Sequence, residues 1–123
     1  GYYMEPTLFI DGDNQSRINQ EEMFGPIAFV IPCKDLEHGL EIANDTQFGL
    51  SSGVITTSLA KAEFFKKNIK TGVTTVNLPT AGLDYHVPFG GRKASSFGLR
   101  EQGTYAKEFY TQIKTSYINA GSI

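Results

Sequence analysis

Apolar residues along the chain follow two periods that alternate with each other. Short runs rich in branched residues predict buried strands at residues 5–10, 26–32, 50–57 and 73–77. Apolar residues spaced three or four apart predict helices after the capping residues Asp35 and Ser58, the second ending near Gly72 at its C′ position.

A last helix is predicted over about residues 99–110, and an alternating strand follows over residues 111–119. Strands that alternate with helices predict an α/β fold with a mainly parallel sheet and flanking helices. Ligands of such sheets lie beyond the carboxyl ends of the strands. The loop after the first strand and the loop after Asn77 are therefore the places where we expect a site.

The stretch QEEMFGP, residues 20–26, lies in the first of these loops. The carboxylates of Glu21 and Glu22 can each accept two hydrogen bonds side by side, which matches the vicinal hydroxyls of a ribose. Phe24 offers a flat apolar face to a ring, held by a Gly-Pro turn. The competing interpretation is that a helix ends here, with solvated carboxylates and a phenylalanine in the core.

The second loop, residues 77–98, has about 20 residues with little predicted secondary structure. A loop of this length inside a compact domain is usually functional, or else it shows that an element has been misassigned. Its aromatic residues stand among glycines and prolines, Gly90 and Gly91 permit close backbone approach, and Arg92 and Lys93 can bind an anion. The alternative is a surface loop held in place by its aromatic side chains.

Composition narrows the class of protein. A chain of 123 residues with 40% apolar residues suits one globular domain. The net charge of −2 gives no electrostatic case for nucleic acid or an anionic membrane, and no apolar run is long enough to span a bilayer. The only cysteine, Cys33, is expected to be a buried, inert thiol, and the two histidines and this cysteine show no metal-ligand spacing.

Several motifs together resemble the NAD(P)-dependent aldehyde dehydrogenases over essentially the whole chain. In order they are EPTLF, QEEMFGP, ANDTQFGLSSGV, TGVTTVN, PFGGRKASSFGLREQG and YTQIKTSYI. The longer stretch YHVPFGGRKASSFGLREQG looks most like the α-ketoglutaric semialdehyde dehydrogenase branch. The family usually reads Ser-Gly-x-Gly-Arg-Glu where this chain has Ser95-Ser96-Phe97-Gly98-Leu99-Arg100-Glu101, and this departure supports the branch assignment.

The resemblance implies roles for five residues. Glu22 would hold the hydroxyls of the nicotinamide ribose, and Phe24 would flank the nicotinamide of NAD or NADP. Phe89 would line the aldehyde channel, with Tyr85 and His86 near its mouth. The residues that distinguish NAD from NADP lie, in the family, outside the region seen here.

In the family, the nucleophilic cysteine, the general-base glutamate and the dinucleotide domain all precede this region, and Cys33 does not align with the nucleophile. The resemblance therefore implies a C-terminal piece that carries no catalytic residue and is inactive alone, which also fits a chain that begins at Gly1. The whole enzyme would oxidise an aldehyde, with a semialdehyde acid as the expected substrate.

The resemblance also implies an organisation into two parts. Residues 1–110 would be the C-terminal part of the catalytic domain, and residues 111–123 an oligomerisation strand and tail that joins copies of the chain. We expect a homo-oligomer in the cytoplasm that binds a small aldehyde, with neither nucleic acid nor membrane as a partner. The alternative is a stand-alone, non-enzymatic oligomerisation or binding module derived from this family.

Overall fold

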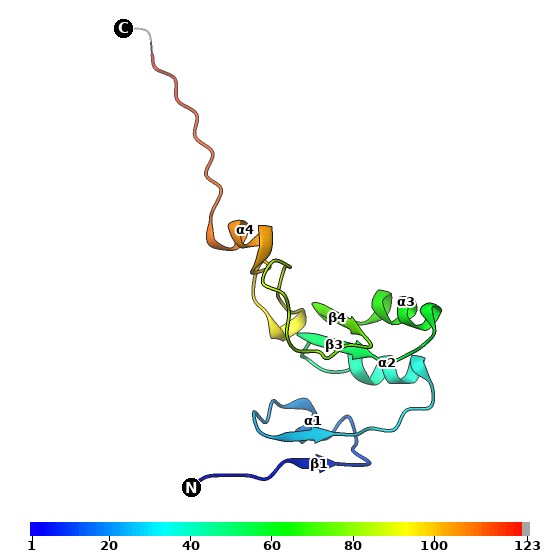
Figure 1. Cartoon of the computed structure of the whole chain (residues 1–123). Coiled ribbons are helices and arrows are strands. Elements are labelled where there is room, and N and C mark those ends of the chain that lie inside the picture. The colour runs from blue at the N-terminus through cyan, green and yellow to red at the C-terminus, as the bar shows by residue number, and fades with distance from the viewer. Residues whose placement is uncertain (122–123) are drawn as a thin grey trace.

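Two pairs of short parallel strands organise the fold, which a computed structural model describes over residues 1–121 (Figure 1). β1 (Thr7–Phe9) pairs with β2 (Ile27–Phe29), and β3 (Ser51–Val54) pairs with β4 (Val73–Val76). The predicted α/β fold with parallel strands is confirmed. The strands form two separate two-stranded sheets, however, because β2 and β3 do not pair with each other.

The helices are short and lie between or after the strands. They are α1 (Arg17–Gln20), α2 (Leu36–Asn44), α3 (Leu59–Asn68), the 3-10 helices η1 (Lys93–Ser95) and η2 (Gly103–Tyr105), and α4 (Ala106–Tyr110). Both predicted caps are confirmed. The Asp35 carboxylate accepts from the backbone N–H of His38 at 2.8 Å, and the Ser58 hydroxyl accepts from that of Lys61 at 3.4 Å.

The core of the described chain is small and lies between the two longer helices and the second sheet. Leu40 of α2 packs with Phe65 of α3 and with Ile69, and Leu36 and Val54 pack against this cluster. The apolar stripes of α2 and α3 therefore meet at this cluster.

The prediction that Gly72 ends α3 at a C′ position was wrong. The helix ends at Asn68, and Ile69 is the C-cap in an extended conformation. Gly72 instead allows its own backbone to approach that of Gly90 and Gly91 closely. A Cβ on Gly72 would overlap the carbonyl oxygen of Gly90 and lie 2.7 Å from the Cα of Gly91. This contact seats the long loop against the start of β4.

The last helix is also shorter than the predicted span of residues 99–110. Glu101 forms an antiparallel bridge with Phe89, and Gln102 has a φ of 66°. Neither the bridge nor the positive φ is compatible with a right-handed helix. Helical structure therefore begins only at Gly103, in η2.

The predicted strand over residues 111–119 is not a strand here. The chain beyond Tyr110 is extended and runs away from the body, without a hydrogen-bonded β partner among residues 1–121 (Figure 1). The last two residues of the predicted segment 111–123 lie outside the described residues. Among the helices that the structure describes, none has the length and hydropathy of a membrane span.

Candidate functional site

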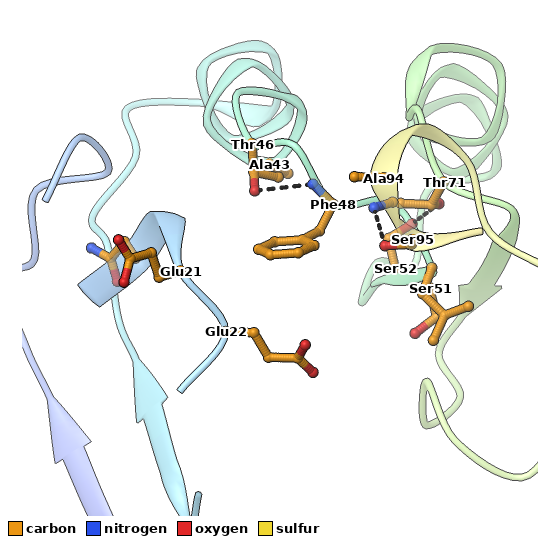
Figure 2. A pocket seen from close by; sticks show the side chains of 13 residues that line it. Glu21, Glu22, Ala43, Thr46, Phe48, Ser51, Ser52, Thr71, Ala94 and Ser95 are labelled. Carbon is orange, nitrogen blue, oxygen red and sulfur yellow. Dashed lines mark hydrogen bonds between the residues drawn. The ribbon is translucent and has the colours of Figure 1, made fainter. Parts of the chain in front are cut away.

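A cavity of about 570 Å³ lies between the segment that follows α1 and the start of β3 (Figure 2). It is lined by Asn19, Glu21, Glu22, Ala43, Thr46, Phe48, Gly49, Leu50, Ser51, Ser52, Thr71, Ala94 and Ser95. One wall comes from the loop after β1, as predicted. The other wall lies at the amino ends of β3 and β4. This differs from the expectation for one continuous parallel sheet, in which ligands lie beyond the carboxyl ends of the strands.

The end of α1 presents two carboxylates to this cavity. Glu21 is the C-cap of α1, so the helix ends within the stretch QEEMFGP. Glu21 and Glu22 of the same stretch line the cavity, so both interpretations of this stretch hold in part. The side-chain amides of Asn14 and Gln20 both donate to the backbone carbonyl of Asp45, at 3.1 and 2.9 Å. These bonds fix the α1 segment against the end of α2.

The two carboxylates differ in their partners. Glu21 accepts from the guanidinium of Arg17 at 2.8 Å, an exposed pair within one turn. Across residues 1–121, Glu22 makes neither an ion pair nor a side-chain hydrogen bond. Its carboxylate extends into the cavity below the ring of Phe48 (Figure 2). Glu22 is therefore the carboxylate available to a ligand.

The opposite wall is held together by hydrogen bonds between η1 and the start of β3. The backbone N–H of Gly49 donates to the Ser95 hydroxyl at 2.8 Å, and the N–H of Arg92 donates to the Gly49 carbonyl at 2.8 Å. The hydroxyls of Ser52 and Thr71 lie 2.7 Å apart (Figure 2). This wall is rigid, neutral and rich in hydroxyl groups.

Lys93, whose sequence position suggested an anion site, is engaged by backbone carbonyls and anchors η1. Its ammonium donates to the backbone carbonyls of Asn44 and Thr46, at 3.0 and 2.8 Å, at the C-terminal end of α2. Desolvation at this position and the nearby charge of Lys70 lower the pKa of Lys93, and the charge of Asp45 opposes them. Lys93 therefore stabilises the wall of the cavity.

Phe24 and Glu22 are not brought into the same cavity. The Phe24 side chain is 93% exposed, its φ is 35°, and it lies outside the cavity lining. The aromatic face inside the cavity belongs to Phe48 (Figure 2). Sequence reasoning missed Phe48, although it stands in the quoted motif ANDTQFGLSSGV, because nothing local marks it as different from a core residue.

A second cavity of about 360 Å³ shares Leu50 and Ser51 with the first. Its other lining residues are Thr80, Ala81, Gly82, Leu83, Phe89 and Gln102. Phe89 is held there by two backbone hydrogen bonds with Glu101, at 2.7 and 2.8 Å. The predicted channel residue therefore lines a cavity that adjoins the carboxylate cavity.

Tyr85 and His86 lie on the surface and are not part of either lining. Their rings meet edge to face with centroids 5.6 Å apart, and both side chains are exposed. The Tyr85 carbonyl accepts from the backbone N–H of Gly103 at 3.3 Å, which ties this part of the loop to η2. They stand a few residues before Phe89 in the same loop.

Cys33 is exposed, so the prediction of a buried thiol was wrong. It follows β2 and lies beside α2, where its sulfur would be 3.2 Å from a Cβ on Gly39. It lines neither of the two cavities that hold Glu22 and Phe89. Residues 1–121 also hold no group of three or more His, Cys, Asp or Glu side chains suited to a metal ion.

The arrangement suits the binding of a ligand that carries hydroxyl groups. An unpaired carboxylate can accept two hydroxyl donors at once, which is the pattern of a ribose diol. The hydroxyl-rich wall and the Phe48 ring offer further polar and apolar contact. Neither cavity is lined by a cysteine or a histidine.

Comparison with known proteins points to one family. The model for "Aldehyde dehydrogenase family" matches residues 1–116. The chain is 46% identical over 118 residues to an alpha-ketoglutarate semialdehyde dehydrogenase of Haloferax volcanii, covering 95% of this chain and 24% of that protein. It is 41% identical over 118 residues to an alpha-ketoglutaric semialdehyde dehydrogenase of Bacillus subtilis, covering 96% and 24%.

Solved structures agree with this result. The aldehyde dehydrogenase of Mycobacterium tuberculosis complexed with NAD+ superimposes with a TM-score of 0.85 at 38% identity, covering 100% of this chain and 25% of that one. The indole-3-acetaldehyde dehydrogenase of P. syringae in complex with NAD+ gives 0.85 at 39% identity, covering 94% and 23%. The chain thus spans about a quarter of the length of these relatives.

Proposed function

Because this chain belongs to the aldehyde dehydrogenase family, we propose that it forms part of the cofactor and substrate walls of an enzyme that oxidises an aldehyde to a carboxylate with NAD+ or NADP+. The observation that carries this proposal is the unpaired carboxylate of Glu22 inside the larger cavity. Within the enzyme, residues 1–110 are the C-terminal part of the catalytic domain.

The residues present fit a nicotinamide ribose. Glu22 supplies two acceptor oxygens for the ribose hydroxyls, and the cavity of about 570 Å³ has room for a sugar and part of a ring. Phe24, two residues further on, is exposed and free to flank the nicotinamide. When bound, the nicotinamide supplies the chemistry of hydride acceptance, and this chain supplies its orientation.

The smaller cavity is the proposed wall of the aldehyde channel. Phe89 lines it, and Tyr85 and His86, which precede Phe89 in the same loop, are the residues proposed for its mouth. The two cavities share Leu50 and Ser51, so a ligand bound by Glu22 and an aldehyde beside Phe89 would be neighbours. A semialdehyde acid is the substrate that the similarity to the Haloferax and Bacillus enzymes favours.

The chain alone is proposed to be inactive. The family reaction needs a thiolate nucleophile, and the only cysteine of this sequence, Cys33, lines neither cavity. The chain therefore orients ligands for catalytic groups that other parts of the enzyme supply. A cytoplasmic location belongs to the same proposal and fits a chain with a single cysteine.

The exposed segment 111–121 supports a homo-oligomer as the assembled form. Its backbone is extended without a β partner, and Ile113, Tyr117 and Ile118 are almost fully exposed. An unpaired extended segment can add to the sheet edge of a second copy. The same segment favours the second candidate function, a non-enzymatic oligomerisation module, which predicts self-association without NAD+ binding.

Replacing Glu22 by glutamine in the full-length enzyme tests the ribose role. Hydrogen bonds to a charged acceptor contribute roughly 1.5–3 kcal/mol, so Glu22→Gln should raise the KM for NAD+ about tenfold or more. Glu21→Gln is the matched control, because Glu21 is already paired with Arg17, and it should change this KM little. Equal KM values for NAD+ in both variants would contradict the assignment of Glu22.

A further inference from the structure

The backbone at Gln102 is held in a conformation that side chains normally avoid. Its φ of 66° and ψ of 166° lie in a region that is essentially reserved for glycine. The strain follows directly after the bridge between Phe89 and Glu101. Gly103 comes next with a φ of 55°, and a Cβ on it would lie about 2.5 Å from the His86 carbonyl oxygen. Of two adjacent positions whose backbone favours glycine, the first therefore carries a glutamine.

The side chain of Gln102 carries an unused hydrogen-bonding atom. Its amide oxygen is buried and has no hydrogen-bond partner among the described residues. Buried acceptors in proteins almost always have a partner, and each exception calls for an explanation. Gln102 also lines the smaller cavity beside Phe89, so the explanation can be a ligand group there.

The cavity wall limits what that ligand group can be. Its side chains are apolar or neutral, and its other polar side chains are the hydroxyls of Ser51 and Thr80. An ionised tail would lose its hydration at such a wall without meeting an opposite charge. A hydroxyl can donate to the amide oxygen of Gln102 at little desolvation cost.

We propose that Gln102 is a specificity-determining residue, whose side-chain amide oxygen accepts a hydrogen bond from a hydroxyl group on the aldehyde substrate. This inference rests on the proposed function, because it takes the cavity at Phe89 as part of the aldehyde channel. It deepens that function by naming the substrate group that this wall binds. A carboxylate on the same substrate would be bound by residues outside this wall.

The first test compares two aldehydes in the full-length enzyme. The quantity measured is the ratio of kcat/KM for 5-hydroxypentanal to that for pentanal. Its change between wild type and variant isolates the hydroxyl contact, because the fraction of open-chain 5-hydroxypentanal is the same for both proteins. Gln102→Met keeps the length of the side chain and removes the amide, so this ratio should fall about tenfold. An unchanged ratio in Gln102→Met would overturn the proposal.

The second test does not require turnover. The side-chain amide signal of Gln102 in the 123-residue chain is assigned by its absence from the Gln102→Met spectrum. Titration with 1,5-pentanediol should shift this signal, and 1-pentanol at equal concentration should not. The same response to both compounds, or none to either, would overturn the inference. If the full-length wild type oxidises neither aldehyde, the proposed function fails, and this titration still decides the role of Gln102.

Discussion

Gly72 shows how one residue without a side chain determines the position of a long loop. Its Cα faces the backbone of Gly90 and Gly91 so closely that no Cβ fits between them. The contact brings the loop that carries Phe89 to the start of β4. The placement of Phe89 thus depends on a glycine that lies far from it in sequence.

Gly72→Ala should destabilise the chain by about 3 kcal/mol, because the added methyl group overlaps backbone atoms that cannot rotate away. Thermal unfolding monitored by circular dichroism measures the loss. Gly25→Ala is the matched control, since a Cβ there would meet only the Met23 carbonyl oxygen at an ordinary 3.5 Å. If the two variants melt at the same temperature, the close approach at Gly72 does not contribute to stability.

At the residue scale, local chemistry was predictable and long-range placement was not. Asp35 and Ser58 were identified as caps because a cap depends only on the next three residues. The carboxylate pair before the Gly-Pro turn marked Glu21 and Glu22 together, and only the family resemblance selected Glu22, which the structure places at the cavity without a side-chain partner. The cavity position of Phe48 and the exposure of Cys33 depend on which segments meet in space, and no local pattern encodes that.

At the element scale, α3 carries an ion pair whose effect depends on pH. The ammonium of Lys66 lies 2.7 Å from the carboxylate of Glu63, one turn earlier. The hydrogen bond and the charge of Lys66 lower the pKa of Glu63 below its ordinary value. A carboxyl whose pKa is lower in the folded state stabilises the fold above its ordinary pKa. That contribution disappears as the pH falls through the folded-state value.

The melting temperature of the wild type should therefore fall more steeply than that of Glu63→Gln between roughly pH 5.5 and pH 3. The difference should be small, because both side chains are exposed to solvent. Lys66→Met removes the partner and keeps the carboxyl, so it should show the same shallow slope as Glu63→Gln. If the melting temperature falls with pH at the same rate in all three proteins, the ion pair makes no pH-dependent contribution to stability.

The elements that were mispredicted share a physical cause. α1 has four residues, which is too short for a helical period to be recognised. The last helix starts late because the bridge at Glu101 and the positive φ at Gln102 override helical propensity. The segment after Tyr110 alternates as a strand should, but a strand is defined by a hydrogen-bonded partner, and the described chain holds none for it.

At the scale of the whole molecule, much apolar surface is exposed and both sheets have open edges. Exposed large apolar side chains occur along the entire described chain, among them Leu8, Ile55, Leu59, Phe97 and Ile113. Among residues 1–121, only five apolar side chains are buried. Surfaces of this kind drive association, and the unpaired edges of β1–β2 and β3–β4 can accept further strands.

The isolated chain should therefore form dimers or larger oligomers at high concentration, as measured by light scattering. Deleting residues 111–123 should lower the average mass if the exposed tail provides the main contact. A matched deletion of residues 1–4, which carry exposed tyrosines outside any strand, should lower it less. A uniform monomer of the intact chain at high concentration would refute the prediction.

The class of fold was predictable at this scale, and the number of sheets was not. The alternation of strand and helix periods identified the parallel strands correctly. Periodicity shows which segments become strands, but it does not show which strand edges meet, so one sheet was expected where two are present. The cavity with Glu22 lies between the parts of the chain that carry these two sheets, and for that reason only one of its walls was anticipated.

The conformation of Gln102 has a consequence for how this protein would respond to selection. A non-glycine residue in that region of backbone space costs on the order of 1–3 kcal/mol. Directed evolution for heat resistance alone would therefore converge on glycine at position 102 and would discard the amide that binds the substrate hydroxyl. Selection for growth on a hydroxylated aldehyde would restore glutamine. The two selections should therefore favour different residues at position 102, glycine for heat resistance and glutamine for use of the hydroxylated substrate.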